Sequence, residues 1–305
     1  MNHDFPWVSH YYGELAALSA AFLWSVASVL YSRIGQYLSP LKMNLLKNII
    51  AMVMAMMVLW GDGGLFVGLD KYAMILLLLS GAIGIGLGDT AYFGALRYIG
   101  ARRALLLTIL SPPITGILAL LFLGESLSSG AWLGIFITVA GVSWVITERA
   151  GGSGSAGAPV KPGILLGLLA AVGQASGAVL SHAAFMHLNI SPIRSALLRL
   201  IGGTFIVLIA MPLLKDAYGQ GYRNLDSLRR WTTVILTVFI GTFLGIWLQQ
   251  LSLKYAAAGI AQTLFATSPL FIIPIVVVTG ERVSPRAVLG ALLAIVGVGF
   301  LFGLQ

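Results

Sequence analysis

Two related stretches decide the fold: GIGLGDTAYFGALRY at Gly84–Tyr98, and GTFLGIWLQQLSLKY at Gly241–Tyr255. Both are largely apolar, both begin with glycines four residues apart, and both end in a basic residue followed by tyrosine. They lie 157 residues apart, so the chain reads as one pattern used twice.

The repeat extends outward from this pair in both directions. Four further matches keep the same order in each half: Gly13 with Gly163, Ser39-Pro40 with Ser191-Pro192, Ser111-Pro112 with Ser268-Pro269, and Gly124-Glu125 with Gly280-Glu281. The offset stays between 150 and 157 residues, a spread that small insertions in loops produce. We therefore predict a first repeat over residues 13–147, a Gly/Ser-rich linker over 148–162, and a second repeat over 163–303.

The composition indicates a membrane protein. Apolar residues make up 58% of the chain and charged residues 9%, whereas soluble domains carry roughly 25% charge. Uninterrupted runs such as MILLLLSGAIGIGLG exclude the alternation of barrel strands. Ten segments reach the length of about 20 residues that a membrane-spanning helix needs: Gly13–Arg33, Pro40–Trp60, Tyr72–Leu96, Arg102–Leu123, Gly130–Thr147, Gly163–His187, Pro192–Leu214, Trp231–Leu253, Ala258–Thr279 and Arg286–Gly303.

The predicted fold is an all-α integral membrane protein with ten transmembrane helices, arranged as two inverted five-helix repeats. Because each repeat has an odd number of spans, the second copy lies upside down relative to the first. Inverted repeats of this kind build a site between the halves that can face either side of the membrane. The sequence therefore predicts a central cavity.

Several other classes are disfavoured. The chain has no cysteine, so thiol catalysis and cysteine-ligated metals are excluded, and its net charge of +8 is scattered over loops instead of forming a nucleic-acid-binding patch. No cleavable signal precedes the first span.

The basic residues predict the orientation in the membrane. Thirteen of them fall on the side opposite the termini, against three on the side of the termini, namely Lys71, Arg194 and Lys254. The positive-inside rule then places both termini outside the cytoplasm.

The matched elements resemble the drug/metabolite transporter superfamily, in particular its EamA-type ten-helix carriers. The resemblance rests on a basic residue early in the second helix of each half (Lys47, Arg199), together with the repeated ALRY/SLKY, Ser-Pro and Gly-Glu motifs. It implies a secondary carrier of small organic metabolites or drugs in the plasma membrane, the inner membrane of a bacterium. It also implies no cofactor, a monomer or weak homodimer, and termini in the cytoplasm, which conflicts with the charge count.

Asp89 is the strongest candidate for chemistry, because ionisable groups inside a membrane are costly and usually functional. At 1.5 Å per residue, Asp89 and Lys47 lie about equally deep, roughly 10 Å from the same membrane surface. We expect Asp89 to bind substrate or a coupling proton, with Lys47 as its partner. The alternative is a purely structural bridge, or a Lys47 that extends to the lipid headgroups.

Further polar and aromatic side chains lie within the predicted spans. We expect those that face the cavity to contact substrate: Trp24, Tyr92, Gln174, Arg199, Trp247 and Gln250. Trp24 and Gln174 occupy equivalent positions of the two repeats. Arg199 suits a carboxylate or phosphate, with Gln249 and Gln250 as its expected polar partners. The alternative, in which Arg199 caps helix ends or meets lipid headgroups, is equally open. Packing against lipid or helices remains the alternative for the aromatic residues.

Prolines within the fourth and ninth predicted helices are candidate hinges: Pro112, Pro113, Pro269 and Pro274. Proline frees a carbonyl group and kinks a helix, although packing without motion is an equal alternative. We read Glu125 and Glu281, at the ends of these helices, as structural.

These patterns predict a secondary active transporter that works by alternating access, with proton-coupled efflux of amino-acid-like solutes or drugs. A substrate exchanger or uptake carrier of the same fold is the alternative. An intramembrane enzyme is disfavoured, because the sequence has no His-Glu-x-x-His motif and no paired aspartates within its spans.

Overall fold

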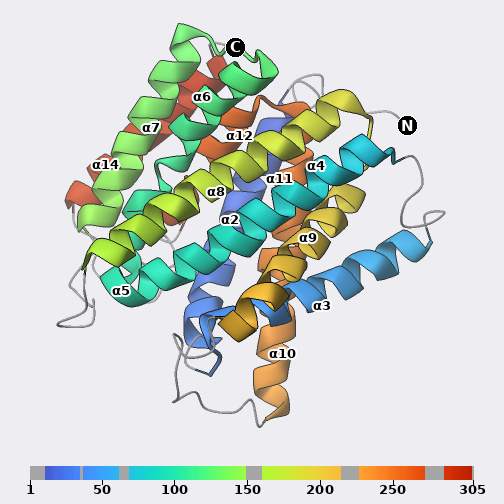
Figure 1. Cartoon of the computed structure of the whole chain (residues 1–305). Coiled ribbons are helices and arrows are strands. Elements are labelled where there is room, and N and C mark those ends of the chain that lie inside the picture. Colours follow the sequence, from blue (N-terminus) through green and yellow to red (C-terminus); the bar gives the residue numbers. More distant parts are fainter. Residues whose placement is uncertain are drawn as a thin grey trace, which may run out of the picture.

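The computed structural model describes residues 11–34, 37–61, 69–148, 160–213, 227–271 and 285–303, and these residues contain helices and no strand (Figure 1). Helices of the first half are α2 (Tyr12–Ile34), α3 (Pro40–Trp60), α4 (Lys71–Gly81), η1 (Ala82–Gly88), α5 (Asp89–Thr108), α6 (Ser111–Leu123) and α7 (Ser129–Glu148). Those of the second half are α8 (Val160–His187), α9 (Pro192–Leu213), α10 (Leu228–Thr237), η2 (Val238–Leu244), α11 (Gly245–Tyr255), α12 (Ala258–Phe265) and α14 (Pro285–Gly303).

Within this described part of the chain, six helical segments are long and apolar enough to cross a membrane, and three further apolar helices are shorter. The six are Tyr12–Tyr31, Leu41–Trp60, Lys71–Ala95, Val160–His187, Pro192–Pro212 and Leu228–Tyr255. Each corresponds to a predicted span. The ninth predicted span, Ala258–Thr279, lies partly outside the described residues, so the count of ten helices stays a prediction.

The boundary between the third and fourth predicted spans was wrong. We expected the third span to end at Leu96, but α5 continues to Thr108, and the helix breaks instead before Ser111. Pro112 and Pro113 therefore occupy the first turn of α6, not a helix interior. A proline is well tolerated there, because the N–H groups of a first turn have no intrahelical acceptor.

One π-helical segment interrupts the third helix of each half, and the two segments occupy matching places. η1 directly precedes Asp89, and η2 directly precedes Gly245. Their wider turns and their glycines let neighbouring backbones approach: a Cβ atom added to Gly177 of α8 would lie 3.0 Å from the Cα atom of Gly84. π-Helical turns are rare and are frequent at functional sites.

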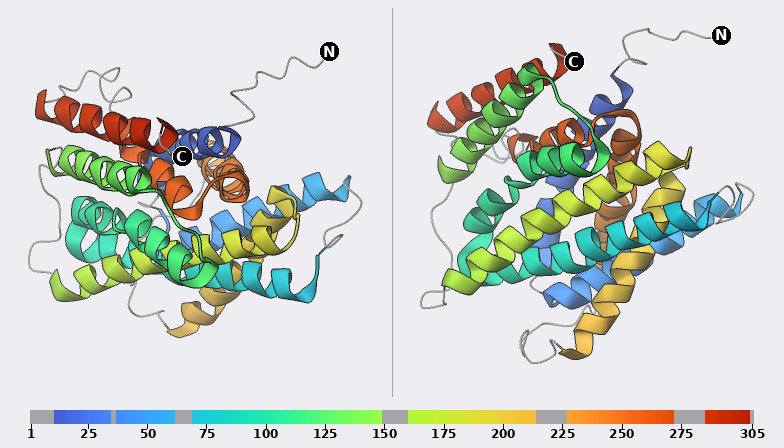
Figure 2. Two further views of the ribbon diagram at one scale, coloured as in Figure 1. Left: turned by 90° about the horizontal axis from the view of Figure 1, so that it is seen from above. Right: turned by 45° about the horizontal axis from the view of Figure 1, so that its top comes forward.

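The two halves pack mainly against each other. α5 contacts α8 while α11 contacts α2, and α3 contacts α9, α6 contacts α12, and α7 contacts α14. Figure 2 shows α7 and α14 side by side at one edge of the bundle. Large apolar side chains cover the outer surface, and Trp60 at the end of α3 is 90% exposed. A surface of this kind is suited to lipid.

Candidate functional site

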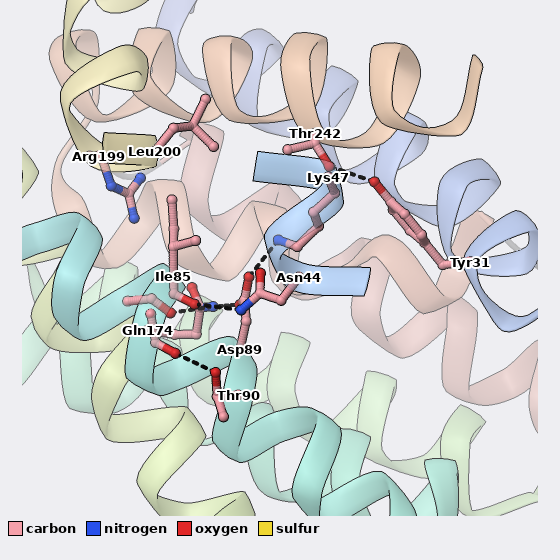
Figure 3. Close-up of polar contacts among 12 residues, drawn as sticks. Tyr31, Asn44, Lys47, Ile85, Asp89, Thr90, Gln174, Arg199, Leu200 and Thr242 are labelled. Atoms are coloured by element: carbon pink, nitrogen blue, oxygen red, sulfur yellow. Dashed lines mark hydrogen bonds and ion pairs between the residues drawn. The ribbon is translucent and has the colours of Figure 1, made fainter. Parts of the chain in front are cut away.

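A buried ion pair forms the centre of the site. Lys47 Nζ, on α3, lies 2.8 Å from Asp89 Oδ2, at the start of α5 (Figure 3). Lys47 is only 3% exposed. A charge this deeply buried needs a partner, and the carboxylate of Asp89 provides it. The structure therefore brings together the two ionisable residues that the sequence placed at equal depth.

Gln174 connects this pair to the second half of the chain. Its Nε2 donates to Asp89 Oδ1 at 2.9 Å and lies 3.4 Å from the carbonyl oxygen of Gly84 in η1. Both carboxylate oxygens of Asp89 thus have a donor, one from each half. On α3, Asn44 Nδ2 donates to the carbonyl oxygen of Ile85 at 3.2 Å, which fixes η1 beside the ion pair (Figure 3).

A cavity of about 120 Å³ opens beside Asp89 and Gln174. This volume is several times the roughly 10–15 Å³ that a single water molecule needs. Both halves contribute to its wall: Trp24, Asp89, Tyr92, Thr108, Ile109, Ser111, Pro112, Gln174, Gln262, Phe265, Ala266, Ser268 and Pro269. Asp89 is the one charged side chain in this lining, so the ion pair presents its negative end to the cavity.

Aromatic rings and amides share the wall. The ring of Trp24 lies 6.3 Å from that of Phe265, within the range of favourable aromatic pairs. On the polar side, Gln262 Nε2 lies 3.4 Å from Ser111 Oγ and 3.4 Å from the backbone oxygen of Gln174. Such a mixture of flat apolar surfaces and a few fixed polar groups is typical of small-molecule sites.

Of the predicted substrate-binding residues, Trp24, Asp89, Tyr92 and Gln174 line the cavity. Lys47 is not among the lining residues, but it pairs with Asp89, which is. Arg199, Trp247 and Gln250 are not among the lining residues, and their predicted contact with substrate stays a prediction.

Arg199 lies in the helix packing beside η1. It is 2% exposed, and its Nη1 donates to Gln249 Oε1 at 3.3 Å. A Cβ atom added to Gly84 would lie 3.2 Å from Arg199 Nη2, so the guanidinium group packs against the backbone of η1. Gln250 instead accepts from Ser195 Oγ at 2.7 Å. Of the two predicted amide partners, Gln249 is the one that contacts Arg199.

Three of the four candidate hinge prolines lie within the described residues, and two of these line the cavity. Pro112 and Pro269 line the cavity at the two helix breaks, and Pro113 follows in the first turn of α6. Pro274 and Glu281 lie outside the described residues. The hinge role of these prolines stays a prediction.

Sequence reasoning missed Gln262 and Phe265 on α12, as well as the hydroxyl groups of Thr108, Ser111 and Ser268. Gln262, like Gln174, is an amide within an apolar run. The same reasoning that predicted Gln174 would therefore have predicted Gln262. Among the described residues, no group of three or more His, Cys, Asp and Glu side chains is placed to hold a metal ion.

Comparisons with known proteins give a consistent result. The sequence matches the EamA-like transporter family twice, over residues 11–147 and again over 161–303. No curated protein sequence matches the chain. Among solved structures 29 chains match. One, described as "Crystal structure of protein", has a TM-score of 0.78 and 18% identity, covering 95% of this chain and 96% of that chain. At that identity, the likeness to the solved structure shows the fold alone.

Proposed function

We propose that this chain, which belongs to the EamA-like transporter family, is a secondary transporter that moves small organic solutes by alternating access. The family and the apolar helices make it a multi-pass membrane protein, which we place in the plasma membrane. The observation that carries the proposal is the cavity between the halves, with the Lys47–Asp89 pair at its wall.

We further propose ten helices in two inverted repeats. The packing supports this arrangement, because contacts between the halves occur in matching sets: α5 with α8 corresponds to α11 with α2, and η1 with α9 corresponds to η2 with α3. Such an exchange of partners is expected when two equivalent units are related by a twofold axis. Rocking of one unit against the other would expose the cavity to each membrane face in turn.

Asp89 is the proposed coupling residue. When it is ionised, the pair with Lys47 is neutral and both of its oxygens accept a hydrogen bond. A proton on Asp89 would leave Lys47 as an uncompensated buried cation, which is costly in this environment. The two protonation states therefore favour different arrangements of α3, α5 and α8. We propose proton-coupled export on this basis, and exchange of one solute for another or uptake by the same fold is the alternative mechanism.

The lining favours amphipathic solutes of the amino-acid or drug-like kind. Trp24, Tyr92 and Phe265 offer apolar surface, whereas Asp89, Gln174 and Gln262 offer hydrogen-bond partners for a polar group. Arg199 adds a buried positive charge against the backbone of η1. We propose that Arg199 acts on the cavity through this charge.

Counterflow in proteoliposomes tests the proposed function. Purified protein is reconstituted with a panel of amino acids, organic acids and aromatic amines, and uptake of labelled solute is measured against an internal excess of the same unlabelled solute. A carrier shows saturable counterflow for one class, which the Asp89→Asn variant loses. A channel shows flux without counterflow, and an enzyme releases a chemically altered solute. Either of these results would overturn the proposal.

A further inference from the structure

A second contact between the halves lies at the end of the bundle near Tyr255. Glu125 follows α6 directly after Gly124, a glycine with a φ of 67° that ends the helix in the left-handed conformation. Glu125 Oε2 lies 3.6 Å from His182 Nε2 on α8 and 3.4 Å from the backbone nitrogen of Ala258 at the start of α12. One first-half carboxylate thus joins two helices of the second half.

The hydrogen bonds of His182 identify which of its nitrogens carries a proton. His182 Nδ1 bonds to the carbonyl oxygen of Leu253, and because a carbonyl oxygen only accepts, Nδ1 must donate. In the neutral ring, Nε2 then has only a lone pair to turn toward the carboxylate of Glu125, and two acceptors face each other. One added proton, on either partner, converts this contact into a hydrogen bond, and a proton on His182 also makes it an ion pair.

An apolar plug lies between this pair and the cavity. Small buried side chains of α6, α8, α11 and α12 form it: Ala119, Ala178, Val179, Leu253, Ala256, Ala258 and Ala261. At 1.5 Å per residue, His182 is about 12 Å along α8 from Gln174, and Ala258 is about 6 Å along α12 from Gln262. The Glu125–His182 pair therefore lies beyond one end of the cavity, with these apolar side chains between them.

We propose that Glu125 and His182 form a second proton-binding site, which latches this end of the cavity shut when it is protonated. The inference rests on the proposed function, since a latch matters only where the cavity opens to alternate faces. Loss of the proton turns attraction into repulsion between two acceptors, which loosens α6 from α8 and α12 and allows the plug to open. Asp89 lines the cavity itself and is a separate site.

Other titratable groups lie at this end of the bundle as well. They are on α11 (Lys254, Tyr255), at the start of α2 (Tyr11, Tyr12, Glu14), at the start of α4 (Asp70, Lys71, Tyr72) and at the start of α9 (Arg194), whereas α12 has none. Lys254 Nζ donates to the carbonyl oxygen of Ile190, and Asp70 Oδ2 lies 2.7 Å from His187 Nε2. The ring of Tyr72 packs on that of His187. Among the described side chains, Glu125 is the charged group in contact with His182.

Cysteine accessibility tests the latch directly, because the chain contains no cysteine of its own. Ser268, which lines the cavity, is replaced by cysteine and labelled with a membrane-impermeant maleimide in intact expressing cells and in inside-out vesicles. We expect labelling from the His182 face to rise about five- to tenfold between roughly pH 5.5 and pH 8, the interval in which histidine loses its proton. Maleimide rates on free cysteine at each pH provide the correction.

Two substitutions of His182 separate the latch from a merely structural contact. His182→Lys keeps a positive charge throughout this interval and should give low labelling that does not vary with pH. His182→Gln cannot be charged, but its amide can donate to Glu125 as the protonated ring does, so it should also give low labelling that does not vary with pH, and Glu125→Gln should likewise remove the pH dependence. Unchanged pH profiles in His182→Gln and Glu125→Gln would overturn the proposal.

The same preparations distinguish a failure of the latch proposal from a failure of the proposed transport function. If no solute shows counterflow but labelling still follows His182, the transport function fails and the latch stands. If counterflow is intact and the pH dependence of labelling is unchanged by the His182 substitutions, the latch fails and the transport function stands. If Glu125→Gln does not fold, the Lys and Gln variants of His182 still decide the outcome.

Discussion

Gln174 of the second half donates a hydrogen bond to Asp89 of the first half at 2.9 Å, on the side of the carboxylate opposite Lys47. This contact makes the buried ion pair part of the boundary between the halves. Movement of α8 relative to α5 would strain or break this hydrogen bond, so the ion pair and the packing of the two halves depend on each other.

Asp89→Asn should abolish solute counterflow while the protein still folds. The substitution leaves Lys47 with a neutral partner, and we expect it to lower the free energy of unfolding by about 2–3 kcal/mol, less than the roughly 3–5 kcal/mol for a fully buried pair. Thermal unfolding in detergent measures the stability. Adding Lys47→Gln removes the stranded charge and should recover stability without recovering counterflow. Full counterflow in a folded Asp89→Asn protein would eliminate Asp89 as the coupling residue.

Gln174→Leu and Gln174→Glu should differ in a diagnostic way. Leucine removes the donor to Asp89, and we expect a loss of stability of about 1–2 kcal/mol, as for other buried hydrogen bonds. Glutamate places a second carboxylate against Asp89, and two negative charges this close disfavour ionisation of both. Counterflow in Gln174→Glu should therefore fall more steeply above neutral pH than in the unaltered protein. Identical pH profiles would show that position 174 does not act on Asp89.

Trp24→Ala should weaken solute binding without affecting membrane insertion. Trp24 lines the cavity beside Phe265, and loss of an aromatic contact surface costs about 1–3 kcal/mol, which is roughly a 5- to 150-fold rise in the solute concentration for half-maximal counterflow. Trp60→Ala is the matched control, because Trp60 is exposed on the outer surface of α3. Equal effects of the two substitutions would place the solute elsewhere.

Gly81→Ala should destabilise the protein strongly, whereas Gly299→Ala should not. A Cβ atom at Gly81 of α4 would overlap the carbonyl oxygen of Arg199 on α9, while nothing lies within 4 Å of a Cβ atom at Gly299. We expect a loss of several kcal/mol for Gly81→Ala, and for Gly299→Ala a gain of up to about 1 kcal/mol from helix propensity. Unfolding temperatures in detergent compare them. An unaffected Gly81→Ala protein would contradict the close approach of α4 and α9.

Asp70 should contribute to the acid sensitivity of the fold. The hydrogen bond from His187, followed by that from the Ala73 backbone N–H, holds the pKa of Asp70 below its usual value of 3.8. A lowered pKa stabilises the folded protein above the unfolded-state pKa, and this stabilisation is lost as the pH falls through the folded-state pKa. Asp70→Asn, which keeps a capping oxygen, should show a shallower decline of unfolding temperature below about pH 4. An unchanged decline would assign the acid sensitivity to other groups.

Much of the site followed from helix geometry alone. Counting at 1.5 Å per residue placed Lys47 and Asp89 at one depth, and the structure pairs them, although the span end at Leu96 from which Asp89 was counted was wrong. The repeat also identified Trp24 and Gln174 as equivalent positions, and both line the cavity. Arg199 had the same signal as Lys47, yet it lies beside η1 in the helix packing, because depth does not define which way a helix face is turned.

Apolar length, scarcity of charge and repeated motifs are properties of the linear chain, so the family and the six long apolar spans could be predicted from it. That Gln174 reaches Asp89, that Gln262 lines the cavity, and that His182 faces Glu125 became visible once the helices were placed in three dimensions. These contacts join residues 85, 88 and 57 positions apart. They depend on the crossing and rotation of helices whose backbones meet at glycines, and the repeating pattern along a single helix does not specify either.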